Sequence, residues 1–124
     1  MSRILLVDDD EDFRKMLHKI LARAGYQVED APNGQAALEI YQARPSDLIV
    51  TDLVMPEKEG IETIVEFRRQ NPAVKIIAIS GGSRITPTVN LAMAQKLGAR
   101  RTLAKPFAPQ ELLDAIAQVL AESP

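Results

Sequence analysis

Five short segments with the length of β-strands are separated by stretches with helical periodicity, and this alternation is the feature that most restricts the fold. The segments are residues 4–7, 27–31, 48–50, 75–79 and 101–104. Apolar residues dominate the first, third and fourth segments, and such runs are typical of strands buried on both faces. Strands that alternate with helices in this way form a parallel sheet covered on both faces, which predicts a doubly wound α/β fold with five strands.

The intervening stretches carry apolar residues at the spacing of a helix. The first helix is marked by Phe13, Leu17 and Leu21 and is expected to end at Gly25. Further helices are expected at residues 37–44, 61–70, 86–97 and 109–120. Ala108 is a poor helix cap, so the last helix is expected to depend on packing rather than on its terminus.

Length and composition limit the number of domains, the compartment and the partners. A chain of 124 residues fits one compact domain, taken as residues 1–124. There is no cysteine, which excludes disulfides and thiolate metal sites. The first apolar run is too short for a signal peptide or a membrane span, which predicts a cytoplasmic protein without membrane insertion. A net charge of −2 argues against direct nucleic-acid binding.

Polar side chains stand where four of the predicted strands end. Asp8 and Asp9 follow the first strand, Asp52 the third, Ser80 the fourth and Lys105 the fifth. In a parallel sheet these positions share one edge, which is where open α/β folds bind their ligands. A lone acid at a strand end is at least as often a cap or turn residue. The other polar strand ends are what favour a functional interpretation of Asp52.

This set of residues has the chemistry of a phosphoryl-transfer site. Clustered carboxylates raise one another's pKa unless a cation lies among them, and Mg²⁺ is a hard cation that binds one or two carboxylates together with waters. An aspartate beside such a metal can form an aspartyl phosphate. The Lys105 ammonium and the Ser80 hydroxyl would then stabilise charge on the phosphoryl oxygens.

Two neighbouring features have simpler structural explanations. Asp10, Glu11 and Asp12 fall in the first turn of a helix, where acids interact favourably with the helix dipole and need no catalytic role. His18 is the only histidine, and no second histidine is present to complete a metal site with it. We therefore expect His18 to be an exposed residue on the polar side of its helix.

Over essentially its whole length the chain resembles the receiver domains of two-component response regulators. The matching residues are Leu6-Val7-Asp8-Asp9, Asp52-x-x-Met55-Pro56-x-x-x-Gly60, Ile79-Ser80-Gly81 and Lys105-Pro106-Phe107. Each motif alone is weak, but all four in this order and at strand ends form a strong signal. The resemblance implies a flavodoxin-like sheet with strand order 2-1-3-4-5. It also implies a phosphorylation-controlled switch rather than a multiple-turnover enzyme.

The resemblance further implies which residues would hold the metal and accept the phosphoryl group. Asp52 would be the phosphoacceptor and would also face the Mg²⁺ ion. Asp9 would ligate Mg²⁺ directly, and Asp8 would act largely through a bound water. The backbone carbonyl of Val54 would supply the remaining protein contact to the metal.

Two further residues and one peptide bond are assigned by the same resemblance. Ser80 would bind the phosphoryl group and report its presence, and Lys105 would pair with that group. The Lys105–Pro106 bond would be cis, which would let the lysine point back into the site. Members of the family usually have an aromatic residue three positions before the lysine. Thr102 stands there, so the usual coupling between Ser80 and the outer surface is not expected.

The resemblance implies protein partners on both sides of the switch. A histidine kinase or histidine phosphotransfer protein would supply the phosphoryl group. A downstream protein target, which the sequence does not identify, would bind the face formed by the fourth helix, fifth strand and fifth helix.

Two other functions compete with this one. The first is a Mg²⁺-dependent phosphohydrolase with an Asp8-x-Asp10 motif. Such an enzyme is expected to have threonine or valine at position 12, where this chain has aspartate. Such an enzyme is also expected to have a cap domain or inserted loop, which the 124 residues do not provide. The second is a degenerate receiver that only binds a partner, and the complete set of site residues argues against it.

Overall fold

A five-stranded sheet forms the centre of the protein, in the order β2-β1-β3-β4-β5, and every neighbouring pair of strands is parallel. The computed structural model describes residues 2–52, 57–80, 95–96 and 98–122. The predicted doubly wound α/β fold and its strand order are both confirmed. The strands are β1 (Arg3–Val7), β2 (Gln27–Ala31), β3 (Leu48–Asp52), β4 (Ile76–Ser80) and β5 (Arg101–Ala104).

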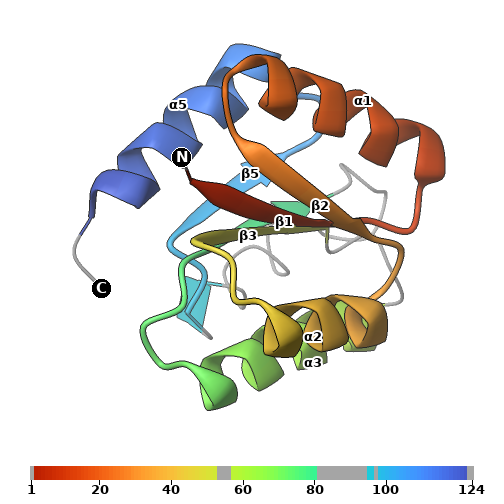
Figure 1. Cartoon of the computed structure of the whole chain (residues 1–124), viewed down its shortest axis with the longest axis vertical. Coiled ribbons are helices and arrows are strands. Elements are labelled where there is room, and N and C mark those ends of the chain that lie inside the picture. The colour runs from red at the N-terminus through yellow and green to blue at the C-terminus, as the bar shows by residue number, and fades with distance from the viewer. Residues whose placement is uncertain (1, 53–56, 81–94, 97, 123–124) are drawn as a thin grey trace.

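Helices cover both faces of this sheet. They are α1 (Glu11–Arg23), α2 (Gly34–Ala43), α3 (Glu57–Gln70) and α5 (Pro109–Ala121). Figure 1 shows α1 and α5 packed on one face of the sheet and α2 and α3 packed on the other. The predicted helix at residues 86–97 falls almost entirely outside the described residues, of which only Gln95 and Lys96 belong to it, and both are helical.

The alternation of side chains along each strand divides the core into two layers. Leu5 and Ile49 point to the α2–α3 side, where they pack with Phe67. Leu6 and Val50 point to the α1–α5 side. Both sets are fully buried. Apolar residues therefore predominate in the central strands, because each position faces one of two helical layers.

The helix ends follow the sequence with one correction. Asp10 caps α1, since its side chain accepts a hydrogen bond from the Phe13 amide at 3.1 Å. Ala108 supplies no side-chain cap to α5, as predicted. The expectation that α5 depends on packing alone is incomplete, because the Glu111 carboxylate accepts a hydrogen bond from the Ala108 amide at 2.9 Å. This contact satisfies a free amide just before the first turn.

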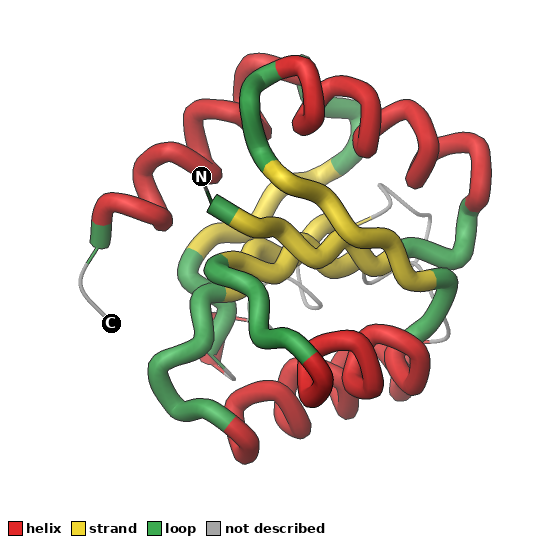
Figure 2. Tube along the Cα trace, in the orientation of Figure 1, coloured by secondary structure: helices red, strands yellow, loops and turns green. Residues whose placement is uncertain are grey.

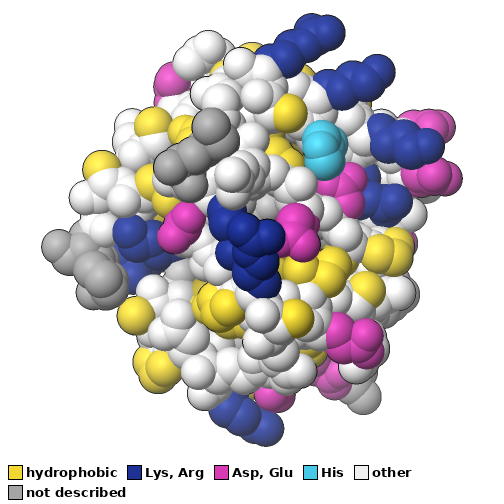
Figure 3. All heavy atoms as spheres, viewed as in Figure 1, with side chains coloured by type: hydrophobic (Ala, Val, Ile, Leu, Met, Phe, Trp, Pro, Cys, Tyr) yellow, Lys and Arg dark blue, Asp and Glu magenta, His cyan; other side chains and the backbone are white. Residues whose placement is uncertain are grey.

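The loops that follow β1 and β2 leave the sheet at the same edge, as Figure 2 shows. On the surface seen in Figure 3, acidic and basic side chains are interspersed without a large area of one sign. No helix in the described part of the chain is long and apolar enough to span a bilayer. The carboxyl ends of all five parallel strands lie at one edge of the sheet, which is where open α/β folds bind their ligands.

Candidate functional site at the carboxyl edge of the sheet

The register of the strands brings the predicted site residues to one level of the sheet. Val7 is paired with Thr51, so Asp8 and Asp52 are the next residues on adjacent strands. Ser80 is paired with Ala104, so Lys105 follows directly beside Ser80. The backbone confirms this last proximity, since the Lys105 amide donates to the Ser80 carbonyl at 2.8 Å.

Three of these side chains are buried, although polar side chains at the ends of strands are usually exposed to solvent. Asp8 and Asp52 are each 1% exposed, and Ser80 is 3% exposed. The Lys105 ammonium lies 2.7 Å from Oδ2 of Asp52, and the lysine side chain is 21% exposed. A buried carboxylate needs a charge partner or several hydrogen bonds, and Lys105 supplies the charge.

Asp8 is also buried, and no basic side chain in the described part of the chain forms an ion pair with it. One of its oxygens, Oδ1, accepts a hydrogen bond from the Asp10 amide at 2.9 Å. The other, Oδ2, is buried and receives no hydrogen bond from the described residues. Burial, followed by hydrogen bonding with Asp52 and by the charge of Asp52, raises the pKa of Asp8 to about 7, against the smaller opposing effects of the Asp10 amide and the Lys105 ammonium. Two adjacent carboxylates and one ammonium leave the site short of positive charge.

The donor set fits a small hard cation. A buried carboxylate oxygen without a donor, beside a second carboxylate, is the arrangement that Mg²⁺ relieves while retaining several of its waters. The described residues contain no group of three or more acidic or histidine side chains placed around a common point. The protein side chains in this part of the chain would therefore supply only part of the coordination, which is usual for Mg²⁺.

The remaining predicted site residues are placed as follows. Asp9 is exposed beside the buried Asp8. Val54 lies outside the described residues, so its carbonyl is not assigned a position. The Lys105–Pro106 peptide bond is cis, which confirms that prediction. Thr102 is half-buried on β5, where it is paired with Ala78 of β4.

Sequence reasoning missed two residues of α1 that contact the site. Nη1 of Arg14 donates to the backbone carbonyl of Asp8 at 2.6 Å. Phe13 lies against Lys105, with the ammonium 3.7 Å from the ring centroid. The signal for both was an aromatic and a basic residue in the first turns of the helix that follows the acids. The helical periodicity placed Phe13 in the apolar stripe of α1 and did not indicate a contact with Lys105.

His18 departs from its prediction in part. Its side chain is 40% exposed, but Nδ1 contacts the Asp30 carboxylate on β2. Asp30 in turn lies 3.7 Å from Nε of Arg14. His18 therefore belongs to a chain of polar contacts that reaches the backbone of Asp8 through Asp30 and Arg14.

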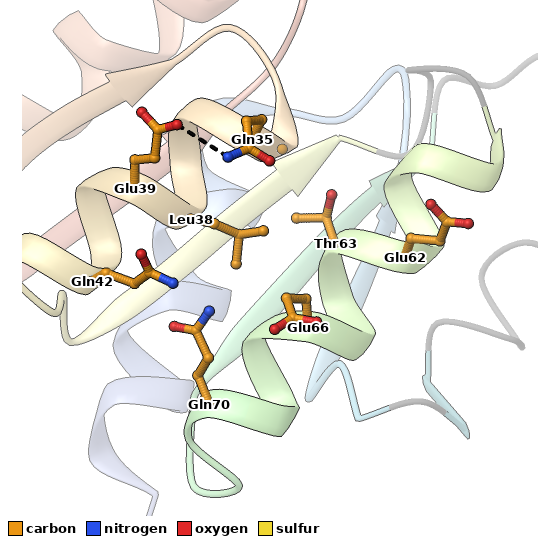
Figure 4. A pocket seen from close by; sticks show the side chains of 9 residues that line it. Gln35, Leu38, Glu39, Gln42, Glu62, Thr63, Glu66 and Gln70 are labelled. Carbon is orange, nitrogen blue, oxygen red and sulfur yellow. Dashed lines mark hydrogen bonds between the residues drawn. The ribbon is translucent and has the colours of Figure 1, made fainter.

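A cavity lies between α2 and α3, away from the predicted site residues. It has a volume of about 550 Å³. Figure 4 shows its polar lining, with Gln35 and Glu39 from α2 joined by a 3.0 Å hydrogen bond and Glu62 and Glu66 from α3. None of the predicted site residues that the structure describes lines it. The site at the sheet edge is defined by buried charge rather than by the size of a pocket.

Comparison with known proteins identifies the class. Residues 4–117 match the family model for the response regulator receiver domain, and the chain belongs to this family. The chain is 36% identical over 119 residues to the chemotaxis protein CheY of Thermotoga maritima, covering 95% of this chain and 97% of that protein. It is 37% identical over 120 residues to the response regulator receiver protein CpdR of Brucella abortus, covering 97% and 98%. Receiver domains of this family are signalling switches rather than enzymes of the usual kind.

Solved structures agree with this assignment. The receiver domain of NtrX from Brucella abortus superimposes with a TM-score of 0.89 at 26% identity, covering 97% of this chain and 99% of that one. The chemotaxis protein CheY4 of Vibrio cholerae gives a TM-score of 0.84 at 31% identity, covering 96% and 98%. The phosphohydrolase alternative therefore loses its support, since both the family and the fold are those of receivers.

Proposed function

We propose that this chain is a phosphorylation-controlled switch in which Asp52 accepts a phosphoryl group. The observation that carries the proposal is the 2.7 Å contact between the Lys105 ammonium and the buried carboxylate of Asp52, with Asp8 beside them. A carboxylate on the last residue of a central strand, held by a cation at the binding edge of the sheet, is placed for attack on an incoming group.

The proposed reaction is a displacement at phosphorus. An Asp52 oxygen attacks the phosphorus of a phosphohistidine on a histidine kinase or histidine phosphotransfer protein. The new P–O bond forms as the P–N bond breaks, and the imidazole leaves with the electron pair and takes up a proton. Lys105 moves from the carboxylate to the developing phosphoryl charge, and the Ser80 hydroxyl donates a hydrogen bond to a phosphoryl oxygen.

Mg²⁺ belongs to this proposal because the carboxylates need a cation. Asp9, Asp8, Asp52 and the Val54 carbonyl are the groups that would hold it. When bound, Mg²⁺ would neutralise charge on the phosphoryl oxygens. The buried Oδ2 of Asp8 supports this assignment, since no group in the described part of the chain donates a hydrogen bond to it.

The proposed output is a change in affinity for a downstream protein target. The face that would change is formed by β5, α5 and the predicted helix at residues 86–97. Thr102 gives this face a smaller side chain than the aromatic residue usual in the family, so the coupling from Ser80 to the surface has to follow another route. We take residues 1–124 to be one receiver domain that acts in the cytoplasm, without direct nucleic-acid binding.

Intact-mass measurement after incubation with acetyl phosphate and Mg²⁺ tests the phosphoacceptor. We expect one phosphoryl group on the wild-type protein, none on Asp52→Asn and little on Lys105→Ala, because these variants lack the nucleophile and its cation. Asp114→Asn, which alters an exposed acid on α5, is the control and should behave like wild type. A phosphoryl adduct on Asp52→Asn would show that another residue is the acceptor.

Calorimetric titration with Mg²⁺ tests the metal ligands. Asp9→Asn is expected to weaken Mg²⁺ binding more than Asp10→Asn, because the Asp10 side chain is already used as the cap of α1. Folding of both variants is checked by their circular dichroism. If Asp10→Asn has the larger effect on affinity, the assignment within the acidic run is wrong.

A further inference from the structure

Phe13 and Asp52 hold the Lys105 ammonium from two sides. The ammonium is 2.7 Å from Oδ2 of Asp52 and 3.7 Å from the centroid of the Phe13 ring. The face of an aromatic ring carries negative potential, so a cation within about 6 Å of the centroid is attracted to it. Phe13 therefore gives the lysine a second attractive contact, and this contact comes from α1 rather than from the sheet.

The ring of Phe13 is itself held in place. Phe107, two residues after Lys105, packs edge-on against it with the ring centroids 6.3 Å apart and the planes at 83°. Edge-to-face contacts of this kind are favourable and fix the ring orientation. Both rings and Lys105 line one apolar groove of about 440 Å³ between α1 and the loop before α5. The ring face under the ammonium is therefore part of an ordered aromatic pair.

We infer that Phe13 is a positioning residue for phosphoryl transfer, acting through Lys105. The inference rests on the proposed function, since it assigns to Phe13 the task of keeping the lysine at Asp52 ready for the phosphoryl group. Lys105 is a long side chain that is still 21% exposed, so the ammonium has water as an alternative environment. The Phe13 ring lowers the free energy of the ammonium inside the site relative to that alternative.

A purely structural role for Phe13 makes different predictions. If the ring served only to fill space between α1 and the sheet, any apolar side chain of similar size would suffice. A cation–π contact depends on the electron density of the ring face and not on its volume. Fluorination reduces that density while changing the shape of the ring little. Fluorinated phenylalanines therefore separate the two roles.

The test replaces Phe13 with mono-, di- and trifluorophenylalanine and measures phosphorylation of Asp52 by acetyl phosphate with Mg²⁺. We expect the maximal rate to fall in steps with each fluorine, by about three- to tenfold over the series, from the strength of such contacts. The donor concentration at half-maximal rate should stay unchanged, because the ring acts on the lysine and not on the donor. The same series at Phe67, buried in the α2–α3 layer, is the matched control and should leave the rate unchanged.

A second readout does not depend on phosphorylation. Ring currents of Phe13 should shift the ε-methylene protons of Lys105 upfield in the NMR spectrum of the unphosphorylated protein. The shift should vanish in Phe13→Leu and persist in Phe13→Tyr. Equal phosphorylation rates across the fluorinated series, or unshifted lysine protons in the wild type, would overturn the inference. A wild-type protein that takes up no phosphoryl group would instead overturn the proposed function, and the NMR measurement would still decide the position of the lysine.

Discussion

Raising the pH from about 5 to about 8 should destabilise the metal-free protein. Asp8 is buried beside Asp52, and its pKa in the folded protein is raised from 3.8 to about 7. The folded state therefore holds this proton more tightly than the unfolded chain does. The stability that the proton contributes is fully present below pH 3.8 and is lost as the pH rises through about 7.

The size of the effect follows from the pKa difference. Of the roughly three units between the unfolded and folded pKa values, about two lie between pH 5 and pH 7, and at about 1.4 kcal/mol per unit they give an upper limit of about 3 kcal/mol. Water entry and small side-chain movements relieve part of the repulsion, so we expect about 2 kcal/mol. For a domain of this size that corresponds to a decrease of roughly 5–10 °C in Tm. Saturating Mg²⁺ should reduce this dependence, because the cation compensates the two carboxylates.

The pH dependence of Tm is measured by thermal unfolding followed by circular dichroism, once with a chelator and once with Mg²⁺. The Asp8→Asn variant should show a much smaller pH dependence, whereas Asp114→Asn, an exposed acid, should keep the wild-type behaviour. His18→Gln serves as the background for all variants, because histidine changes charge near neutral pH. Glu11 does not interfere: Lys15 lowers its pKa, so its contribution is lost only as the pH falls below this window.

Either of two results would show that Asp8 does not hold its proton more tightly in the folded protein. One is a metal-free protein whose Tm is the same at both pH values. The other is an Asp8→Asn variant that loses as much stability between them as the wild type. Either result would mean that the carboxylates of Asp8 and Asp52 do not share a poorly solvated site in the absence of metal.

The remaining predictions concern packing and the lifetime of the phosphorylated state. Gly34→Ala should destabilise the fold by about 1–3 kcal/mol in urea unfolding, since a Cβ there would lie 2.1 Å from Oγ1 of Thr63; Thr63→Ala should recover part of the loss, and no recovery would disprove the clash. Phosphorylated protein should lose its phosphoryl group slowly. The residue two positions after Asp52 is Val54, and the residue two positions after Ser80 is Gly82. Neither side chain can orient an attacking water. The double variant Val54→Asn with Gly82→Glu should release phosphate faster, by up to about 10²-fold, and an unchanged rate would contradict this.

Much of the fold could be predicted from sequence because its signals are local. Residues 48–50 are apolar and are followed by Thr51 and the carboxylate of Asp52, and an unbroken apolar run of this kind is typical of a strand buried on both faces. Once the strands are parallel, their ends share an edge, so Asp8, Asp52 and Lys105 could be grouped without coordinates. Tertiary structure added little to the identity of these residues.

What tertiary structure alone decided is how other elements meet that edge. The contact of Phe13 with Lys105 depends on the rotation and height of α1 over the sheet, and periodicity fixes neither. The same holds for Arg14 at the Asp8 carbonyl and for His18 at Asp30. The raised pKa of Asp8 also depends on burial, which only the packed structure defines. Sequence periodicity determines which side of an element is apolar, but the atoms that touch between distant elements are set by the packing of complete side chains.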